Sequence, residues 1–341
     1  MKAATIKPGI FFMNSIALHT ETLADLLGAR AEEGLQISEV FLVACGGSLV
    51  DLYPSKFLLE SESRNLKTGF YTANEFVHAF PKVLGEGSIV ILCSHSGNTP
   101  EVVEAAKKAN SAGAITVTLT HNEASRIAGF SDCNIVYEWG DESRIQNNPM
   151  AICLALCLET LQQSEGYVNY DEFREAFWKI DAIVKAACSQ VGERAAIFAE
   201  AYQNEELFYI LSSGPSYGHA YGFAICSLME MQWLHASSIH SGEFFHGPFE
   251  ITDENTNFIV LVNEGRTRPL DLRVIDFLKK YAKCYVVVDA RDLGIGVLPG
   301  SVVEFFNPIL FYSVMCVYRE ALAKLRKHPL ETRRYMGKVD Y

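Results

Sequence analysis

Short apolar runs alternate with amphipathic stretches along the first half of the chain. The apolar runs predict strands at 40–44, 68–71, 88–93, 114–119 and 134–137. Helices are expected between them, one that reaches Leu59 after the first strand and one from Pro100 to about Ser111 after the third. Strands that alternate with helices in this way predict a parallel sheet with helices on both faces.

Two long helical stretches follow, and the alternation of strands and helices then returns. The helices are predicted at 146–163 and 170–204, and the alternation resumes at Leu207. We therefore expect an α/β protein with two tandem domains, each a parallel sheet flanked by helices in a flavodoxin-like three-layer sandwich. The first domain should span residues 1–168, and the second should span 169–341 with the linking helix and the C-terminal tail.

The two halves of the chain repeat one another at an offset of 168 residues. In this frame Glu62 falls on Glu230, and His78 falls on His246. Further matches in the same frame are Gly46 with Gly214, Ser48 with Ser216, Glu75-Phe76 with Glu243-Phe244, Gly97 with Gly265, and Thr99 with Thr267. The frame holds without a gap from about residue 40 to residue 99, which predicts a duplicated domain.

A turn rich in hydroxyl groups, from Ser94 to Thr99, follows the third predicted strand. It reads Ser-His-Ser-Gly-Asn-Thr and leads into the helix that starts at Pro100. Backbone N–H groups at the start of a helix, together with the helix dipole, favour an anion, and Gly97 lets the backbone approach a ligand closely. Thr99 suits the N-cap position of the helix. The alternative is an ordinary capped turn between a strand and a helix.

A second turn at the same sheet edge favours the phosphate interpretation. Gly46-Gly47-Ser48 follows the first predicted strand and supplies another hydroxyl group. Ligands of such folds lie at the carboxyl ends of the strands, where both turns are expected. The predicted phosphate ligands are Ser48, Ser94, His95, Ser96 and Thr99. Gly46 and Gly47 are candidate contacts to the rest of the substrate.

The corresponding loop of the second half, Asn263 to Thr267, lacks the serines and contains Glu264. A carboxylate in this place would repel a phosphate group. The sequence therefore predicts one working phosphate loop per chain, in the first half.

A glutamate and a histidine of the second half are candidates for acid–base chemistry. Glu230 lies in the segment 228–233, on a mostly apolar predicted helix. A carboxylate in apolar surroundings can act as a base near neutral pH, and a solvated helix face is the alternative. His246 lies between aromatic residues and a Gly-Pro turn, where a working side chain is common; a packing histidine is the alternative. Glu243 is a candidate substrate contact.

A metal site in this region is not expected. His235, His240 and His246 with Glu243 lie on what we predict as a segment from helix to loop, and their spacings form no recognised ligand set.

Composition limits the partners and the compartment. The formal net charge of −12 argues against a nucleic acid or an anionic membrane as partner. The nine cysteines lack the spacing of a disulfide scaffold, which favours the reducing cytosol; Cys153 and Cys157 are predicted to be packed core thiols. We expect neither a signal peptide at the N-terminus nor a membrane span.

Together these features resemble the sugar isomerase (SIS) domain family. The serine loop, the duplication and the block Ser-Gly-Glu-x-x-His-Gly-Pro at 241–248 are similar to double-SIS enzymes, including the isomerase half of glucosamine 6-phosphate synthase. The resemblance covers nearly the whole chain. It implies that Glu230, sixteen residues before His246, moves a proton between C1 and C2 of the sugar. It also implies that His246 and Lys338 assist ring opening.

The resemblance further implies a homodimer, or a larger oligomer, in which His246 reaches the active site of the neighbouring subunit. The synthase starts with a glutaminase domain whose nucleophile is an N-terminal cysteine. Lys2 stands at that place here, and we expect no such domain before residue 40.

Among free-standing double-SIS enzymes, the chain is most similar to the fructosamine 6-phosphate deglycases of the fructose-asparagine and fructoselysine types. The segments that carry this similarity are 45–48, 229–233, 239–251 and 332–341. The implied reaction hydrolyses an N-linked fructosyl amino acid 6-phosphate to glucose 6-phosphate and the amino acid, without a metal or cofactor.

Two alternatives stay open. One is an aldose–ketose isomerase of sugar phosphates, or a free-standing enzyme of the glucosamine 6-phosphate isomerase or deaminase kind. The other is a sugar-phosphate sensor without catalytic activity, although such regulators usually carry a helix-turn-helix region, and the residues before the first strand lack a basic cluster.

Overall fold

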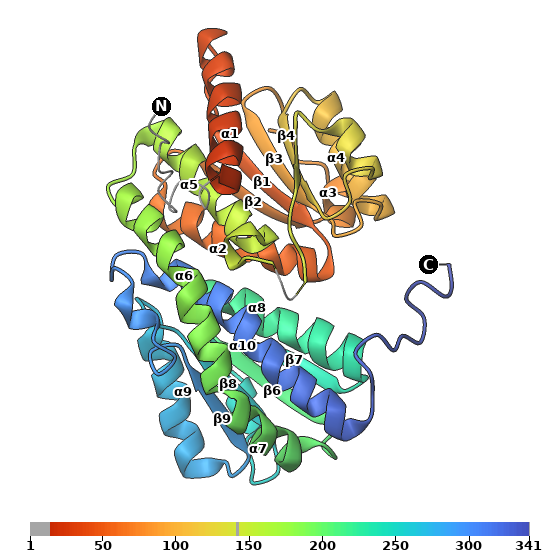
Figure 1. The fold of residues 1–341 in the computed structure, drawn as a ribbon, viewed down its shortest axis with the longest axis vertical. Coiled ribbons are helices and arrows are strands. Elements are labelled where there is room, and N and C mark those ends of the chain that lie inside the picture. The colour runs from red at the N-terminus through yellow and green to blue at the C-terminus, as the bar shows by residue number, and fades with distance from the viewer. Residues whose placement is uncertain (1–13, 141–142, 341) are drawn as a thin grey trace, which may run out of the picture. The chain divides into compact units, whose positions relative to one another are not determined.

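The computed structural model of the protein describes residues 14–140 and 143–340. It divides into two compact units, Met1–Tyr170 and Asp171–Tyr341 (Figure 1). Lys2 and the rest of the N-terminal start of the chain, about which the sequence analysis made predictions, lie outside the described residues, as does Tyr341. None of the helices found in the described ranges is both long enough and apolar enough to cross a membrane.

The first unit is a parallel sheet of five strands with helices between them. Its strands are β1 (Glu39–Ala44), β2 (Lys67–Thr72), β3 (Ser88–Cys93), β4 (Ile115–Thr120) and β5 (Cys133–Val136). Its α-helices are α1 (Asn14–Glu32), α2 (Gly46–Glu62), α3 (Ala73–His78), α4 (Pro100–Ser111) and α5 (Pro149–Glu165), with short 3-10 helices at Arg126–Phe130 and Ile145–Asn147. All five predicted strands are confirmed, and the α/β class with them.

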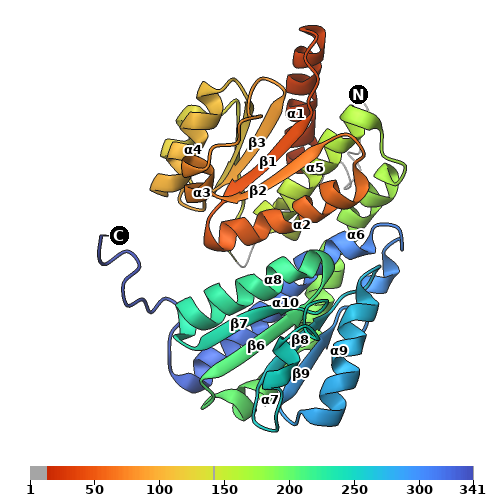
Figure 2. The same cartoon turned by 180° about the vertical axis from the view of Figure 1, so that it is seen from behind.

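The order of the strands in this sheet is β2-β1-β3-β4-β5, and every neighbouring pair is parallel. After β1 the chain crosses to β2 on one side, whereas after β3 it crosses to β4 on the other side. The topological switch point, where ligands of doubly wound sheets bind, therefore lies between β1 and β3. Helices α3 and α4 cover one face of the sheet, and α1, α2 and α5 cover the other (Figures 1 and 2).

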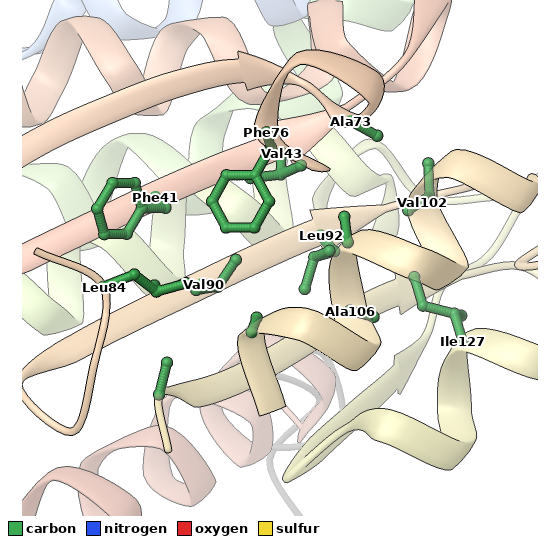
Figure 3. Packing of buried hydrophobic residues seen from close by; sticks show 13 residues of the cluster. Phe41, Val43, Ala73, Phe76, Leu84, Val90, Leu92, Val102, Ala106 and Ile127 are labelled. Carbon is green, nitrogen blue, oxygen red and sulfur yellow. The ribbon is translucent and has the colours of Figure 1, made fainter. Parts of the chain in front are cut away.

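The core under α3 and α4 explains why β1 and β3 are held firmly. Alternate residues of these strands, Phe41 with Val43 and Val90 with Leu92, point to the same face and are buried. They pack against Phe76 of α3 and against residues of α4 (Figure 3). Because both faces of a parallel sheet are covered, β1 and β3 are apolar after their first residues, as their continuous hydrophobic runs predicted.

The second unit contains a parallel sheet of four strands. The strands are β6 (Leu207–Ser212), β7 (His235–His240), β8 (Phe258–Val262) and β9 (Tyr285–Asp289), in the order β7-β6-β8-β9. The α-helices are α6 (Tyr170–Gln190), α7 (Gly192–Tyr202), α8 (Tyr217–Gly222), α9 (Arg268–Tyr281) and α10 (Val303–Arg326). Helix α8 is preceded by a 3-10 turn, η3 (Gly214–Ser216), and continues into a π-helix, η4 (Phe223–Glu230). Two further 3-10 helices are η5 (Pro248–Ile251) and η6 (Ile295–Val297).

Two predictions for this part of the chain are wrong. The single helix predicted at 170–204 is two helices, because the chain breaks at Val191 before Gly192 starts α7. The segment His235–His240, which we placed on a run from helix to loop, is the edge strand β7 and pairs with β6. Its side chains are mostly polar because only one neighbouring strand and part of one face cover it.

The repeat is confirmed by the bounds of the elements. Adding 168 to the bounds of β1 and β2 gives the bounds of β6 and β7. The same shift carries α2, residues 46–62, onto the helical run 214–230 formed by η3, α8 and η4. The two sheets also share their strand order, except that the second has four strands in the described residues and the first has five.

Candidate functional site

The two hydroxyl-bearing turns of the first unit start side by side. Ala44 and Cys93, the last residues of β1 and β3, are partners in the register of the parallel pair. The turn with Ser48 follows the first, and the loop that starts at Ser94 follows the second. The fold therefore places both turns at the switch point between β1 and β3, the ligand position of this sheet order.

Hydrogen bonds within the loop hold Ser94 and Thr99 together. The hydroxyl groups of the two side chains are 3.0 Å apart, and the backbone N–H of Gly97 donates to Ser94 Oγ over 3.1 Å. Ser94 is buried, whereas Ser96 is exposed. Thr99 occupies the predicted N-cap position, but its side chain makes no capping bond to α4. The N–H groups of the first turn of α4 are therefore not capped by the Thr99 hydroxyl.

Gly97 is required by the shape of the loop. Its φ of +64° lies in the left-handed region, which side chains rarely adopt. A Cβ atom at this position would lie 2.3 Å from Cβ of Ser125 and 2.7 Å from Oγ1 of Thr120. Both facts require glycine, so the loop passes closely over the residues that follow β4.

The His95 side chain belongs to an aromatic cluster beside the loop. Its Nδ1 lies 3.0 Å from the hydroxyl of Tyr137, and its ring stacks on that of His121 with centroids 5.1 Å apart. Trp139 meets the His95 ring edge-on at 4.9 Å. Burial, and secondarily the neighbouring His121, lowers the pKa of His95. The sequence analysis singled out only His95; His121, Tyr137 and Trp139 could have been found because they directly follow β4 and β5 at the same sheet edge.

Internal ion pairs fill the corresponding loop of the second unit. Glu264 pairs with Arg291 over 2.8 Å and with Arg268 over 3.4 Å, and Arg268 also pairs with Asp289 over 2.6 Å. The amide of Asn263 donates to the carbonyl of Ser213 over 2.6 Å. These side chains bind one another; that this loop holds no phosphate stays a prediction.

Glycines at equivalent positions show the difference between the two units. Gly46 and Gly214 both have positive φ, +56° and +52°. A Cβ atom on Gly214 would lie 2.5 Å from Oγ1 of Thr267, whereas a Cβ atom on Gly46 would meet nothing within 4 Å. In the second unit, Thr267 therefore occupies the space beside Gly214. The equivalent space beside Gly46 in the first unit is open.

Glu230 is the last residue of the π-helix η4, and it is only partly exposed. One carboxylate oxygen, Oε1, forms an ion pair with Nη2 of Arg333 over 2.7 Å. Arg333 belongs to the C-terminal tail. The Glu230 side chain is therefore held in an ion pair with the tail, whereas the alternative considered for it was a solvated position on a helix face. The π-helix geometry, which places one extra residue in a turn, often accompanies functional sites.

The segment with His246 is anchored on both sides of the imidazole. Ser241 Oγ donates to Oδ1 of the buried Asp271 over 2.7 Å, and Phe244 is fully buried against Phe258. His246 and Glu243 are exposed, and the backbone N–H of His246 donates to the Glu243 carbonyl over 2.9 Å. The buried anchors thus present the two polar side chains at the surface of the unit.

Lys338 lies in the same tail as Arg333. It is exposed, and its Nζ donates to the backbone carbonyl of Arg333. The structure thus brings the tail to Glu230 through Arg333, a contact that the sequence analysis missed because the two residues are 103 positions apart.

The described residues include no group of three or more His, Cys, Asp or Glu side chains that could hold a metal ion. All nine cysteines lie in the described part of the chain and are free thiols, with Cys153 and Cys157 buried in α5 as predicted.

Comparisons with known proteins agree on one family. The profile of the SIS domain matches residues 37–160. The chain is 42% identical over 309 residues to the fructosamine deglycase FrlB of Bacillus subtilis (strain 168), covering 91% of this chain and 94% of that protein. It is 26% identical to the fructoselysine 6-phosphate deglycase of Escherichia coli (strain K12), covering 93% and 91%.

Solved structures give the same result. A Salmonella typhimurium LT2 protein provisionally assigned as a phosphosugar isomerase has a TM-score of 0.92 and 42% identity, with 100% of this chain and 99% of that chain covered. The C-terminal domain of glucosamine-fructose-6-phosphate aminotransferase from Francisella tularensis has a TM-score of 0.74 and 18% identity, with 94% and 97% covered. The second likeness concerns the fold alone.

Proposed function

Since this chain belongs to the SIS domain family and is an enzyme of its deglycase and isomerase kind, we propose that it is a fructosamine 6-phosphate deglycase. The observation that carries the proposal is the 42% identity to a fructosamine deglycase over 91% of the chain. The proposed substrate is an amino acid joined through its nitrogen to C1 of fructose 6-phosphate. The open hydroxyl-lined turns at the switch point of the first sheet suit the phosphate of such a substrate.

Phosphate binding is assigned to the two turns of the first unit. Ser48, Ser94, Ser96 and Thr99 supply hydroxyl donors, and the start of α4 supplies N–H groups and the positive end of its dipole. Hydroxyl and amide donors hold the dianion without a fixed cation, which suits an acidic protein. His95 lies at the loop, and its ring supports the loop through the contacts with His121 and Tyr137.

Proton transfer is assigned to Glu230 and His246. His246, with Lys338, assists opening of the sugar ring. Glu230 then removes a proton from C1 to give an enaminol, and a proton returned to C2 leaves an imine at C1. Water adds to the imine, and breakage of the C1–N bond releases glucose 6-phosphate and the free amino acid. Positioned proton transfer typically contributes about 10²–10⁴-fold to the rate.

The proposed active site is shared between the subunits of a homodimer. The exposed position of His246 in a single chain supports this arrangement, because its ring is available to a neighbour. Gly46, Gly47 and Glu243 are proposed to contact the rest of the substrate. We place the enzyme in the cytosol, and the nine free thiols support a reducing compartment.

The deciding experiment offers the purified protein a panel of fructosyl amino acid 6-phosphates, including those of asparagine and lysine. Release of glucose 6-phosphate is followed with a coupled dehydrogenase. We expect turnover of at least one member and none of the unphosphorylated analogues, because the phosphate loop orients the sugar. Failure of every member of the panel would reject the deglycase assignment.

An aldose–ketose isomerase is the second candidate function, and the likeness to the Salmonella structure that is provisionally assigned as a phosphosugar isomerase favours it. The same base and loop would serve both reactions. Incubation with fructose 6-phosphate alone separates them, since interconversion with glucose 6-phosphate at a rate equal to the deglycase rate identifies an isomerase.

A further inference from the structure

The C-terminal tail docks on the end of the helix that carries Glu230. The amide of the buried Gln232 donates to the carbonyl of His328 over 2.9 Å. The ring of Trp233 packs edge-on against the His328 ring at 4.7 Å, and the guanidinium of Arg334 lies 4.3 Å from the centre of the Trp233 ring. In both ribbon views the tail leaves α10 beside the end of this helical run (Figures 1 and 2).

Trp233 has a strained backbone that serves this docking. Its φ of +56° lies in the left-handed region, which is rare for a bulky residue and costs free energy. The backbone N–H groups of Trp233 and Leu234 still bond to the carbonyls of Met229 and Leu228. The left-handed turn at Trp233 therefore ends the helical run two residues after Glu230, at Gln232, and sends the indole to the tail.

The tail holds the guanidinium of Arg333 in one direction. Nη1 donates to the carbonyl of Leu330 over 2.6 Å and to that of Thr332 over 3.0 Å. Nη2 is the atom that contacts Oε1 of Glu230. Because its two terminal nitrogens have separate partners, the guanidinium is bound on both sides.

The ion pair differs from an ordinary surface pair. The side chains of Arg333 and Glu230 are 21% and 25% exposed, so most of each is removed from water. Exposed pairs contribute little because two mobile side chains must be ordered. Here the docking of the tail orders the arginine before the pair forms. In the described part of the chain, no side chain donates a hydrogen bond to the second carboxylate oxygen, Oε2.

We propose that Arg333 is a positioning residue for catalysis, which holds Oε1 of Glu230 so that Oε2 faces the proton on C1 of the substrate. This proposal rests on the proposed function, in which Glu230 is the base. The guanidinium places a positive charge beside the carboxylate, and the fixed contact removes the rotational freedom of the carboxylate. The docked tail is thus part of the catalytic apparatus, through Arg333 as well as through the position of Lys338.

Three variants test the proposal. Arg333→Gln removes the charge, Arg333→Lys keeps a charge without the planar fork, and Arg334→Gln is the matched control. The control removes the same charge from the same tail and breaks the contact with Trp233, but leaves the partner of Glu230 in place. The substrate is the fructosyl amino acid 6-phosphate of asparagine or of lysine, whichever the wild type converts faster.

We expect Arg333→Gln to lower kcat by about 10- to 100-fold with KM within about threefold, since a misplaced catalytic group loses rate rather than phosphate binding. Arg333→Lys should recover part of this loss, because it keeps a positive charge beside Glu230. Arg334→Gln should lose far less of kcat than Arg333→Gln, since the hydrogen bond from Gln232 to His328 still docks the tail. Thermal melts of all three variants check that they fold.

Equal losses in Arg333→Gln and Arg334→Gln would overturn the proposal, because docking of the tail alone would then explain them. An unchanged kcat in Arg333→Gln would overturn it as well. Glu230→Gln separates this proposal from the function itself. If Glu230→Gln is inactive and Arg333→Gln is not, only the positioning role fails; if Glu230→Gln turns over normally, the proposed base is wrong.

Discussion

Asp51 and His219 occupy the same position in the two repeats, one helical turn after Ser48 and Ser216, at the offset of 168 residues. Both side chains are buried. Burial raises the pKa of Asp51 to about 8 and lowers the pKa of His219 to about 3, with Arg319 adding to the second shift. Both groups are therefore neutral at pH 7, although the sequence shows a carboxylate and an imidazole.

Asp51 should make the protein less stable as the pH rises. Its folded pKa lies above the unfolded value, so the folded state binds the proton more tightly, and this stabilisation is lost between about pH 4 and pH 8. We expect Asp51→Asn to raise the free energy of unfolding relative to the wild type, by as much as about 4 kcal/mol at pH 7. Urea unfolding at pH 4, 6 and 8 measures it, and a difference that does not grow with pH would contradict the prediction.

His219 should make the protein less stable as the pH falls, the opposite of the effect of Asp51. Its folded pKa lies below the unfolded value, so stability is lost as the pH falls from about 6.5 towards 3. Neither ring nitrogen has a hydrogen-bond partner among the described residues. His219→Leu should therefore be at least as stable as the wild type at pH 8 and about 2 kcal/mol more stable at pH 5. The same stability difference at both pH values would show that the imidazole is not held neutral.

The threonines at equivalent loop positions give a matched test of the phosphate site. Thr99 pairs with Ser94 in the open turn, whereas the buried Oγ1 of Thr267 packs over Gly214 and has no partner in the described structure. Thr99→Val should raise KM by about 10- to 100-fold, since a hydrogen bond to a charged group contributes about 1.5–3 kcal/mol. Thr267→Val should leave KM unchanged. Steady-state kinetics gives KM for the two variants. A larger rise in KM for Thr267→Val than for Thr99→Val would assign the phosphate site to the second unit.

Much of the fold follows from local patterns in the sequence. The strand 88–93 and the helix 100–111 were predicted with the bounds that the structure has, because a continuous apolar run marks a buried parallel strand and Pro100 marks a helix start. Strand β7 could not be recognised by its own residues, since only Ile239 is buried in it. The repeat did contain the information, because β7 coincides with β2 after the shift of 168 residues.

The parts of the candidate site that sequence reasoning missed are tertiary. Arg333 reaches Glu230 only because the tail returns to the end of η4, and no spacing rule connects residues so far apart. In the second unit, Thr267 occupies the space beside Gly214 because the two turns that carry these residues approach each other, and residue type alone does not reveal that approach. By contrast, Ser48 and Ser94 could be placed together from strand order alone, because parallel strands end at the same edge.

The proposal that two subunits share each active site makes a prediction that one chain alone cannot satisfy. Glu230→Gln and His246→Ala should each lose about 10²–10⁴-fold in turnover as pure proteins, whereas Glu250→Gln, an exposed glutamate near His246, should remain active. If His246 serves the neighbour's Glu230, a mixed dimer of the two inactive variants contains one intact site. The isolated mixed dimer should then have about half of the wild-type activity, since one of its two sites is intact. The variants are co-expressed with different tags, and the doubly tagged dimer is isolated and assayed. A mixed dimer as inactive as its parents would place both residues in the same subunit's site, and the dimer would then have to be explained without a shared centre.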